Sequence, residues 1–247
     1  MFYRTLHLLS GILTAALVIG SIAATPAAAQ SLTPERETTC DPAVGSAIPL
    51  NDPADEAAVC AQRIYEMAAT DTLALRQDHY DAITVEAWDG ASIQVETVVV
   101  ARRSAEDAAR ADVAQVALNR IETPGASRLF ASGPPNDAPG WWSVRYRVRV
   151  PSETVLDIQS DNASIAVHDV VGGHRLRSHN GSLVYRLPAA SSARLQAETE
   201  NGRIQTTFPV ATQGTLSSYY VDIVVGENGP DVMLATRNGD ITIQRAQ

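Results

Sequence analysis

A short sequence phrase occurs four times between Leu156 and Ile243 and restricts the folds open to this chain. In each copy, apolar or hydroxyl residues alternate toward an asparagine, and the alternation resumes three residues later. Period-two alternation places these side chains on one face of a β-strand, so each copy predicts two strands joined by a turn. The turn residues are Asn162, Asn180, Gly181, Asn201, Gly202, Asn238 and Gly239.

The spacing of the asparagines predicts stacked units. The intervals are 18 residues (162 to 180), 21 residues (180 to 201) and 37 residues (201 to 238). The last interval holds another alternating run, Tyr219 to Val225, so we interpret it as two units, of which one lacks the asparagine. A unit of this size cannot bury its own apolar face, whereas stacked copies share one core. We therefore expect an all-β fold of the β-solenoid or β-helix kind.

The Asn-Gly pairs are expected to make the turns of this stack. Both residues tolerate positive φ, which turns the chain sharply between two strands. Stacked amide side chains would form a ladder inside the stack or at its corner. An antiparallel sandwich of ordinary hairpins is the alternative, because Asn-Gly is also the strongest short hairpin signal. The recurrence of one hydroxyl-x-Asn phrase in register favours the stack.

The first 29 residues have the pattern of a secretory signal peptide. Arg4 and His7 precede an apolar run from Leu8 to Ala24, and an Ala-x-Ala end predicts cleavage after Ala29. A membrane anchor is the alternative, but the run is short and has no basic stop on its far side. We expect an exported mature chain, periplasmic or secreted, without a transmembrane segment.

Charge narrows the classes of partner. All 19 basic residues are arginine, against 28 aspartates and glutamates, for a net charge of −9. Removal of residues 1–29, which contain one arginine and no acid, leaves a net charge of −10. This balance disfavours nonspecific binding to nucleic acid and to anionic lipid.

Residues 30–78 are expected to form a helical and loop segment ahead of a repeat domain at 79–247. Cys40 and Cys60 are the only cysteines, and in an exported chain they predict one disulfide, with two free thiols as the alternative. Asp52-Pro53 is typical of a helix start. The apolar face of that helix would be formed by Ala57, Cys60, Ala61, Ile64 and Ala68.

The region from 80 to 151 predicts strands interrupted by one helix. Alternation at 83–87 and 93–100 flanks the turn Trp88-Asp89-Gly90. Ser104 and Asp107 have the pattern of a capping box, with a helix that extends to about Asn119. Residues 144–150 alternate valine or tyrosine with arginine, which predicts a half-buried strand with a basic outer face.

These features resemble the adhesin-like β-strand-repeat family, a bacterial domain of unknown function. The resemblance is carried by Trp88-Asp89-Gly90, the helix at 104–119, the strand from Arg145 to Pro151 and the Ser/Thr-x-Asn-Gly phrases, and it covers about residues 80 to 246. It implies an exported β-solenoid-like domain without a recognised active site, and it offers no catalytic residue to transfer. The chain departs from the pattern at Ala163, where glycine is usual, and at His174, where an aliphatic residue is usual.

No catalytic, cofactor-binding or metal-binding set is predicted. His168, His174 and His179 are close in sequence, and imidazole suits zinc or copper. Alternation, however, places His174 and His179 on opposite faces of one strand. Ser178 and His179 also point to opposite faces, so they cannot form a nucleophile–base pair.

Acidic residues at the turns are interpreted as solvated charge. Asp161, Glu200 and Asp240 would be brought together by stacking, which leaves a calcium site as the alternative. The glycine-rich nonapeptide repeat typical of calcium-binding β-helices is missing from the sequence.

Three functions remain open. The preferred one is an exported, non-catalytic interaction or structural module of the cell envelope, with an envelope protein or a glycan as its partner. The second is a polysaccharide-active β-helix enzyme, a lyase or hydrolase, that uses outward arginines with carboxylates; the same arginines would otherwise keep exposed strands soluble. The third is a regulatory partner in envelope stress. The outward arginines are Arg175, Arg177, Arg186 and Arg194.

Overall fold

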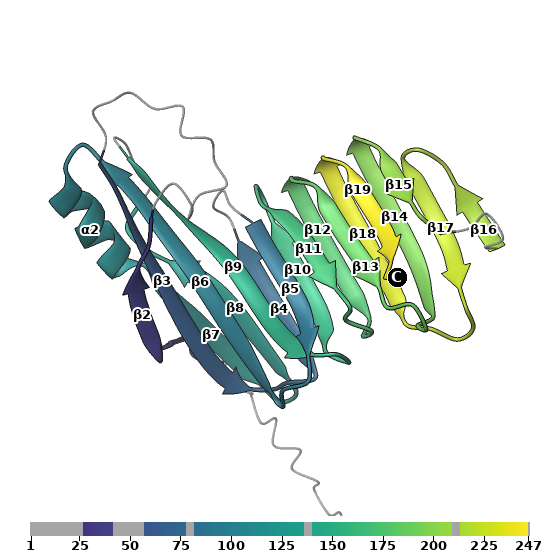
Figure 1. The fold of residues 1–247 in the computed structure, drawn as a ribbon, viewed down its shortest axis with the longest axis horizontal. Coiled ribbons are helices and arrows are strands. Elements are labelled where there is room, and N and C mark those ends of the chain that lie inside the picture. The colour runs from purple at the N-terminus through teal and green to yellow at the C-terminus, as the bar shows by residue number, and fades with distance from the viewer. Residues whose placement is uncertain (1–26, 42–56, 78–81, 136–139, 209–212, 247) are drawn as a thin grey trace, which may run out of the picture.

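The computed structural model describes residues 27–41, 57–77, 82–135, 140–208 and 213–246. These residues form two facing β-sheets, with a helix at one end of the molecule and the short strand β16 at the other (Figure 1). The expected all-β class is confirmed. No helix in the described part of the chain is long and apolar enough to cross a membrane. Residues 1–26 of the predicted signal peptide lie outside the described residues.

The first sheet has ten described strands, in the order β1–β7–β8–β4–β10–β12–β18–β14–β17–β16. They are β1 (Gln30–Ser31), β7 (Ala117–Thr123), β8 (Ala126–Ser132), β4 (Thr72–Gln77), β10 (Val155–Ser160), β12 (His174–Asn180), β18 (Asp231–Asn238), β14 (Ala193–Asn201), β17 (Tyr220–Val225) and β16 (Gln213–Leu216).

The second sheet has nine described strands, in the order β15–β19–β13–β11–β5–β9–β6–β3–β2. They are β15 (Ile204–Thr206), β19 (Ile241–Arg245), β13 (Leu183–Leu187), β11 (Ser164–His168), β5 (Ala82–Trp88), β9 (Trp141–Pro151), β6 (Ser92–Arg103), β3 (Ala57–Ala68) and β2 (Arg36–Thr39). The helix α2 (Glu106–Gln115) connects β6 to β7 and thus joins the two sheets.

The inner faces of both sheets contribute to one hydrophobic core. Leu129 and Leu176 enter it from the ten-stranded sheet, and Tyr146 and Tyr185 enter it from the nine-stranded sheet. All four side chains are fully buried. Burial of an apolar side chain of this size contributes about 1.5–3 kcal/mol. The alternation in sequence is therefore the pattern of strands with one buried and one solvent-facing side.

The four repeats pair in parallel and in register on both sheets. On the ten-stranded sheet, Leu156 lies opposite His174, His174 opposite Val232, and Val232 opposite Leu195. On the nine-stranded sheet, β11, β13, β19 and β15 pair in the same way. The spatial order is first, second, fourth, third repeat, because the chain returns to insert its last repeat between the second and the third.

The interpretation of Tyr219 to Val225 as a further stacked unit is wrong. This segment contains β17, which runs antiparallel to β14 and also pairs with β16. It extends the ten-stranded sheet as a hairpin beyond the third repeat. Alternation reports that a segment is a strand with two different faces, but it carries no information about the direction of pairing.

The Asn-Gly turns do not use positive φ, contrary to the sequence-based expectation. Among the described residues, positive φ occurs at six other positions and at none of the four turns. Glycine is required for a different reason, because adjacent turns touch. A Cβ atom on Gly181 would lie 2.2 Å from the carbonyl oxygen of Ala163, and one on Gly239 would lie 2.3 Å from that of Gly181. On Gly202 it would lie 2.0 Å from the carbonyl oxygen of Gly239.

The asparagine side chains form a row of hydrogen bonds along the stack. Asn180 donates to the Asn162 amide oxygen at 2.9 Å, Asn238 donates to Asn180 at 2.7 Å, and Asn201 donates to Asn238 at 2.9 Å. Most of these amides are solvent-exposed, so the row lies at the outer corner of the turns.

The hydroxyl residue of each phrase makes a second row. Ser178 donates to the carbonyl oxygen of Ala163 at 2.9 Å, and Thr236 donates to that of Gly181 at 2.8 Å. Thr199 donates to Gly239 in the same way, at 2.9 Å. The hydroxyl-x-Asn-Gly phrase thus combines two hydrogen-bonding side chains with a residue small enough for the turns to meet.

The predicted N-terminal helix is wrong over residues 57–68, and its expected start at 52–56 lies outside the described residues. Residues 57–68 form β3, which pairs antiparallel with β2 and β6. Ala61, Arg63, Tyr65 and Met67 are buried, which is a period of two. Strands from the 30–78 segment belong to both sheets.

The expected disulfide between Cys40 and Cys60 is present, with a Cα–Cα distance of 5.2 Å. It links the end of β2 to β3. In an entropic account, closing this loop stabilises the fold by about 3 kcal/mol.

The helix predicted at 104–119 is present but shorter. It spans Glu106–Gln115, its N-cap residue is Ala105, and no side chain caps it, so the capping box expected from Ser104 and Asp107 is wrong. Residues from Ala117 onward form β7 instead. Arg63 reaches the other end of α2 and donates to the carbonyl oxygens of Val113, at 2.8 Å, and Val116.

Candidate functional site

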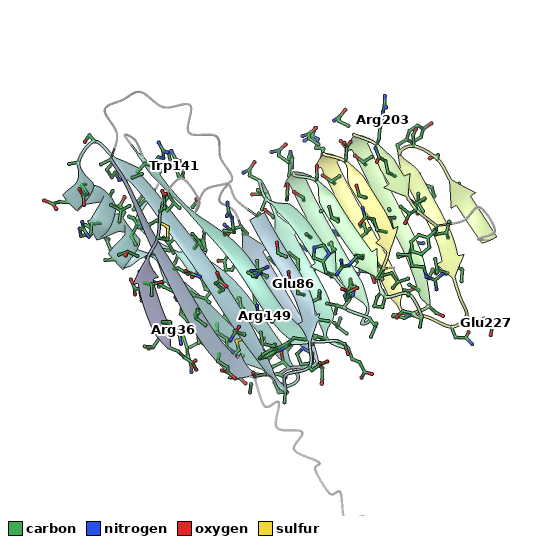
Figure 2. The ribbon with its side chains drawn as sticks, in the orientation of Figure 1. Arg36, Glu86, Trp141, Arg149, Arg203 and Glu227 are labelled. Atoms are coloured by element: carbon green, nitrogen blue, oxygen red, sulfur yellow. A yellow bond between two sulfur atoms is a disulfide. The ribbon has the colours of Figure 1, made fainter. Side chains whose placement is uncertain are left out.

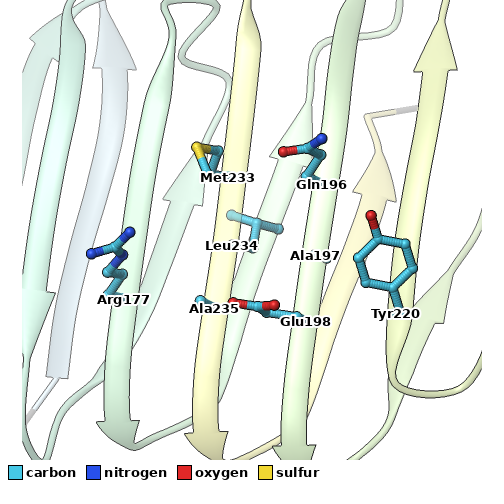
Figure 3. Close-up of a pocket in the computed structure, with 8 residues that line it drawn as sticks. All are labelled: Arg177, Gln196, Ala197, Glu198, Tyr220, Met233, Leu234 and Ala235. Carbon is cyan, nitrogen blue, oxygen red and sulfur yellow. The ribbon is translucent and has the colours of Figure 1, made fainter.

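The outer face of the ten-stranded sheet is hollowed where the repeats meet. The register aligns Arg177 of β12, Ala235 of β18, Glu198 of β14 and Tyr220 of β17 in one row across the strands. Because Ala235 is short, a hollow of about 200 Å³ lies above it, between the longer side chains of Arg177 and Glu198 (Figure 3). Met233, one row away on β18, borders the same hollow.

This hollow continues into two neighbouring ones. A hollow of about 480 Å³ shares Arg177, Glu198 and Tyr220 with it and adds Tyr219. A third hollow of about 390 Å³ contains Arg177 and extends to Arg76 on β4. The three are called the outer-face groove below. The groove therefore crosses the strands, from β4 to β17, and does not run along them.

Large apolar side chains gather at one end of the outer-face groove. Five such side chains are exposed in the described part of the chain, and four of them lie on β17, β18 or the turn before β17. Tyr219 is 64% exposed, and Tyr220, Val224 and Met233 are between 37% and 42% exposed. Exposed aromatic groups beside charged groups are typical of binding surfaces.

Some charges of the groove are paired and others are not. Arg76 forms an ion pair with Asp157 at 3.4 Å, and Arg237 forms one with Glu200 at 3.1 Å. Within the described residues, neither an ion pair nor a side-chain hydrogen bond engages Arg177, Glu198 or Asp161, which line the hollows. These three charged groups are available to a ligand, and Arg175, which lines none of the hollows, lies two residues before Arg177 on the same face of β12.

The outer face of the nine-stranded sheet differs from the outer-face groove in the pairing of its charged side chains. It has a hollow of about 480 Å³ beside Cys40, but the charged side chains of this hollow have partners. Gln62 donates to Glu96 at 2.7 Å, Arg147 pairs with Glu86 at 3.5 Å, and Arg149 donates to Gln94 at 3.2 Å. Figure 2 shows Glu86 and Arg149 side by side on this face. The outer-face groove is therefore the stronger candidate.

The four arginines proposed from the sequence are divided between the two sheets. Arg175 and Arg177 are exposed on β12, within the ten-stranded sheet. Arg194 lies on the same sheet, 3.7 Å from Asp222. Arg186 lies on the nine-stranded sheet, where it pairs with Asp169. Arg175 and Arg177 thus lie side by side on the outward face of one strand, while Arg186 and Arg194 each have an acidic partner.

The three clustered histidines occupy separate environments. His174 is buried in the core, with Nε2 3.1 Å from the Val170 carbonyl oxygen and its ring 5.6 Å from that of Tyr185. Burial lowers the pKa of His174, against the opposing effect of its backbone hydrogen bonds. His168 is half-buried on the nine-stranded sheet, and burial followed by the charge of Arg186 lowers its pKa. His179 is exposed on the ten-stranded sheet, 3.3 Å from Arg237.

Two of the three turn acids and Ser178 have side-chain contacts, whereas Asp161 is exposed and lines one of the hollows. Glu200 pairs with Arg237, and the Asp240 carboxylate accepts the backbone N–H of Arg203 at 2.8 Å. Ser178 belongs to the hydroxyl row of the turns. In the described part of the chain, no group of three or more His, Cys, Asp or Glu side chains is placed to hold a metal ion.

The repeat pattern in the sequence did not point to Ala235, Glu198, Tyr220 or Met233 as groove residues. A signal for part of the row exists, because Gln159, Arg177, Glu198 and Ala235 all directly precede the hydroxyl residue of their repeat. Aligning the repeats therefore places them in one row. The neighbours within that row depend on the order of the strands, which the alignment does not give.

Comparison with known proteins finds no matching family model and no matching curated protein. Among solved structures, the chain is similar to a putative cell adhesion protein from Clostridium sporogenes, at 10% identity, covering 75% of this chain and 99% of that one, with a TM-score of 0.48. It is also similar to a putative adhesin from Bacteroides fragilis, at 8% identity, covering 76% and 97%, with a TM-score of 0.25. A putative cell adhesion protein and a putative adhesin are the kind of protein that the repeat motifs resemble, but likenesses this distant assign no function.

Proposed function

We propose that this protein is an exported, non-catalytic interaction module of the cell envelope, and that it binds its partner in the outer-face groove. The repeats would act as a short β-solenoid that presents a rigid face. The observation that carries the proposal is the pair Arg177 and Glu198, which flank Ala235 without an ion pair among the described residues.

Physical reasoning favours binding at this position. A charged side chain that already has a partner must lose it before it can bind a ligand, whereas Arg177 and Glu198 have no partner to lose within the part of the chain that the structure describes. Tyr219 and Tyr220 supply exposed aromatic surface at the same place. Tyrosine and arginine are enriched where binding energy is concentrated. The strands hold these groups in fixed positions, so little conformational entropy is lost on binding.

Export is supported by two independent features. The N-terminal sequence has the pattern of a signal peptide, and Cys40 is joined to Cys60. Disulfides persist in oxidising compartments, which include the bacterial periplasm and the cell surface. Expression of the full chain with its first 29 residues, followed by mass measurement of the exported form, tests the predicted cleavage after Ala29.

Filling the groove tests the proposed function. Ala235→Trp places a large ring in the hollow, and Ala166→Trp places the same ring on an outward position of β11 in the nine-stranded sheet. Both variants and the wild type are measured by biolayer interferometry against a panel of purified envelope glycans and surface proteins. The proposal predicts a partner whose binding is lost with Ala235→Trp and retained with Ala166→Trp.

Two results would contradict the proposed function. One is a panel in which no partner binds the wild type. The other is a partner whose binding is equally retained, or equally lost, in the two variants. Melting temperatures close to that of the wild type show that each variant is folded.

A polysaccharide-active enzyme is the second candidate, and the position of Glu198 near Arg177 in a groove favours it. Glycoside hydrolysis commonly requires two carboxyl groups on either side of the scissile bond. In the hollow above Ala235, Glu198 is the one lining carboxylate among the described residues. Release of reducing or unsaturated ends from an acidic polysaccharide by the wild type, and its loss in Arg177→Ala, would establish the enzyme. Equal rates in the two proteins would exclude a role for Arg177.

A further inference from the structure

The geometry points to an acidic polysaccharide as the ligand of the outer-face groove, with its chain crossing the strands from Arg76 toward Tyr220. This inference rests on the proposed function and specifies the ligand. It is carried by the direction of the groove, the side chains along its floor and the charge that they leave unpaired.

The spacing between neighbouring strands in the row that forms the floor matches the length of one sugar residue in a polysaccharide. Six adjacent strands contribute one outward residue each, in the order Arg76, Gln159, Arg177, Ala235, Glu198 and Tyr220. Neighbouring strands are about 4.8 Å apart, so the row is about 24 Å long. This strand spacing is close to the length of one pyranose residue in an extended chain. Successive sugar rings would therefore meet successive strands.

The residue types of the row suit a sugar chain that carries carboxylates. Arg177 is free of ion pairs among the described residues, and so is Arg175, which lies outside the row, two residues earlier on the same face of β12. Arginine binds a carboxylate through two parallel hydrogen bonds. Gln159 and Glu198 offer acceptors for hydroxyl groups. The exposed ring of Tyr220 provides an apolar surface for one face of a sugar ring.

A peptide ligand fits this surface less well. An extended peptide binds at a free sheet edge, where backbone groups are unpaired, whereas the groove lies on the face of strands that are paired on both sides. A helical peptide requires a long apolar groove. Here charged and amide groups interrupt the apolar lining that Ala197, Met233, Leu234 and Ala235 provide.

The inserted fourth repeat keeps the two charged groups apart. If the repeats stacked in sequence order, the second and third would be neighbours, and Arg177 would lie directly opposite Glu198. Opposite charges at that cross-strand position attract each other. Instead, β18 lies between β12 and β14, so Ala235 separates Arg177 from Glu198 by two strand spacings, about 10 Å. The insertion thus creates both the hollow and the free charges.

Isothermal titration calorimetry with uronic acid polymers tests this inference. The probes are polygalacturonate, alginate and hyaluronate, each as an oligomer series of increasing length and each with a carboxyl-reduced, neutral form. The mature chain with its disulfide intact is the protein. We expect one of these polymers to bind, with affinity that rises with length until the row is spanned and then stays constant. Carboxyl reduction should weaken binding about tenfold or more.

Matched arginine variants locate the site. Arg177→Gln keeps a hydrogen-bonding side chain but removes the charge, and should weaken binding about tenfold. Arg147→Gln, on the outer face of the nine-stranded sheet, should change it by less than about twofold. Binding should also weaken as salt concentration rises.

Several outcomes overturn the inference. They are failure of all three polymers to bind, equal binding of the carboxyl-reduced forms, and equal effects of the two arginine variants. A neutral glycan or a protein whose binding is lost only in Ala235→Trp would overturn this inference and keep the proposed function. Absence of any partner sensitive to Ala235→Trp would remove both.

Discussion

At the scale of single residues, the turns of adjacent repeats lie so close together that a methyl group has no room on the turn glycines. Each turn glycine lies against the carbonyl oxygen of the neighbouring turn, at distances that no Cβ atom can occupy. Ala163, in the first repeat, is the one turn position after asparagine that is not glycine. A Cβ atom added to Gly181 would point toward it. Each glycine thus faces the turn of an adjacent repeat, and the first repeat has no Asn-Gly turn on its other side among the described residues.

Replacing Gly239 by alanine should separate two adjacent turns. The added Cβ would lie 2.3 Å from the carbonyl oxygen of Gly181, so the backbone must move. We expect a loss of about 2 kcal/mol in the free energy of unfolding, measured by urea denaturation. Gly173→Ala is the control, because its Cβ would lie 3.4 Å from the nearest atom, and it should cost less than about 1 kcal/mol. Equal stabilities of the two variants would show that the turns do not touch.

The imidazole of His174 should make the fold sensitive to acid. Its pKa is lowered in the folded state by burial, so the unfolded chain binds the proton more readily. Stability is then unaffected above the unfolded pKa of about 6.5 and falls as pH decreases from that value toward the folded pKa. Urea denaturation at pH 7.5 and pH 5.5 should give a smaller difference for His174→Leu than for the wild type.

The effect of His174 is separable from that of His168. The pKa of His168 is also lowered, so His174→Leu retains part of the acid sensitivity. The carboxylates contribute equally to both proteins and cancel in the comparison. An identical pH dependence in the wild type and His174→Leu would contradict the assignment.

At the scale of elements, helix α2 and strand β3 depend on each other through Arg63. The guanidinium enters the space between the sheets, donates to two carbonyl oxygens at the end of α2 and pairs with Glu37 at 3.2 Å. The last carbonyl groups of a helix have no partner within the helix. Arg63 therefore fixes α2 against the nine-stranded sheet.

Arg63→Met should loosen this end of the molecule. The buried carbonyl oxygens of Val113 and Val116 lose a charged donor, for an expected cost of about 2 kcal/mol. Hydrogen exchange should increase in α2 and leave the repeats unchanged. Arg36→Met, on the exposed strand β2, serves as the control and should have little effect. Unchanged exchange in α2 would show that Arg63 does not hold the helix.

The strands could be predicted from the sequence where the local alternation of apolar and polar residues determines them. Alternation identified the strands of the four repeats and their buried positions, including His174. The same reasoning failed for β3, because small residues such as Ala57, Ala61 and Ala68 fit a helical period as well as a strand period. It also could not find the order of the strands. That order follows from long-range pairing, and it alone places Ala235 between Arg177 and Glu198.

At the scale of the whole molecule, the two outer faces have different roles in this account. On the nine-stranded sheet, Arg147 pairs with Glu86, Gln62 donates to Glu96, and the disulfide lies at one end. The ten-stranded sheet leaves charges and tyrosines exposed along the outer-face groove. A surface of paired charges resists association, whereas unpaired charge beside aromatic surface favours it. The asymmetry predicts binding on one face only.

Hydroxyl-radical footprinting of the wild type with and without its bound glycan tests most directly whether binding occurs on one face only. Both faces contain oxidisable side chains. Met233, Tyr219 and Tyr220 report on the outer-face groove, and Trp141 reports on the nine-stranded sheet. We expect the bound glycan to lower the oxidation rate of Met233 and Tyr220 and to leave that of Trp141 unchanged. Protection of Trp141 with unchanged oxidation of Met233 and Tyr220 would contradict this expectation.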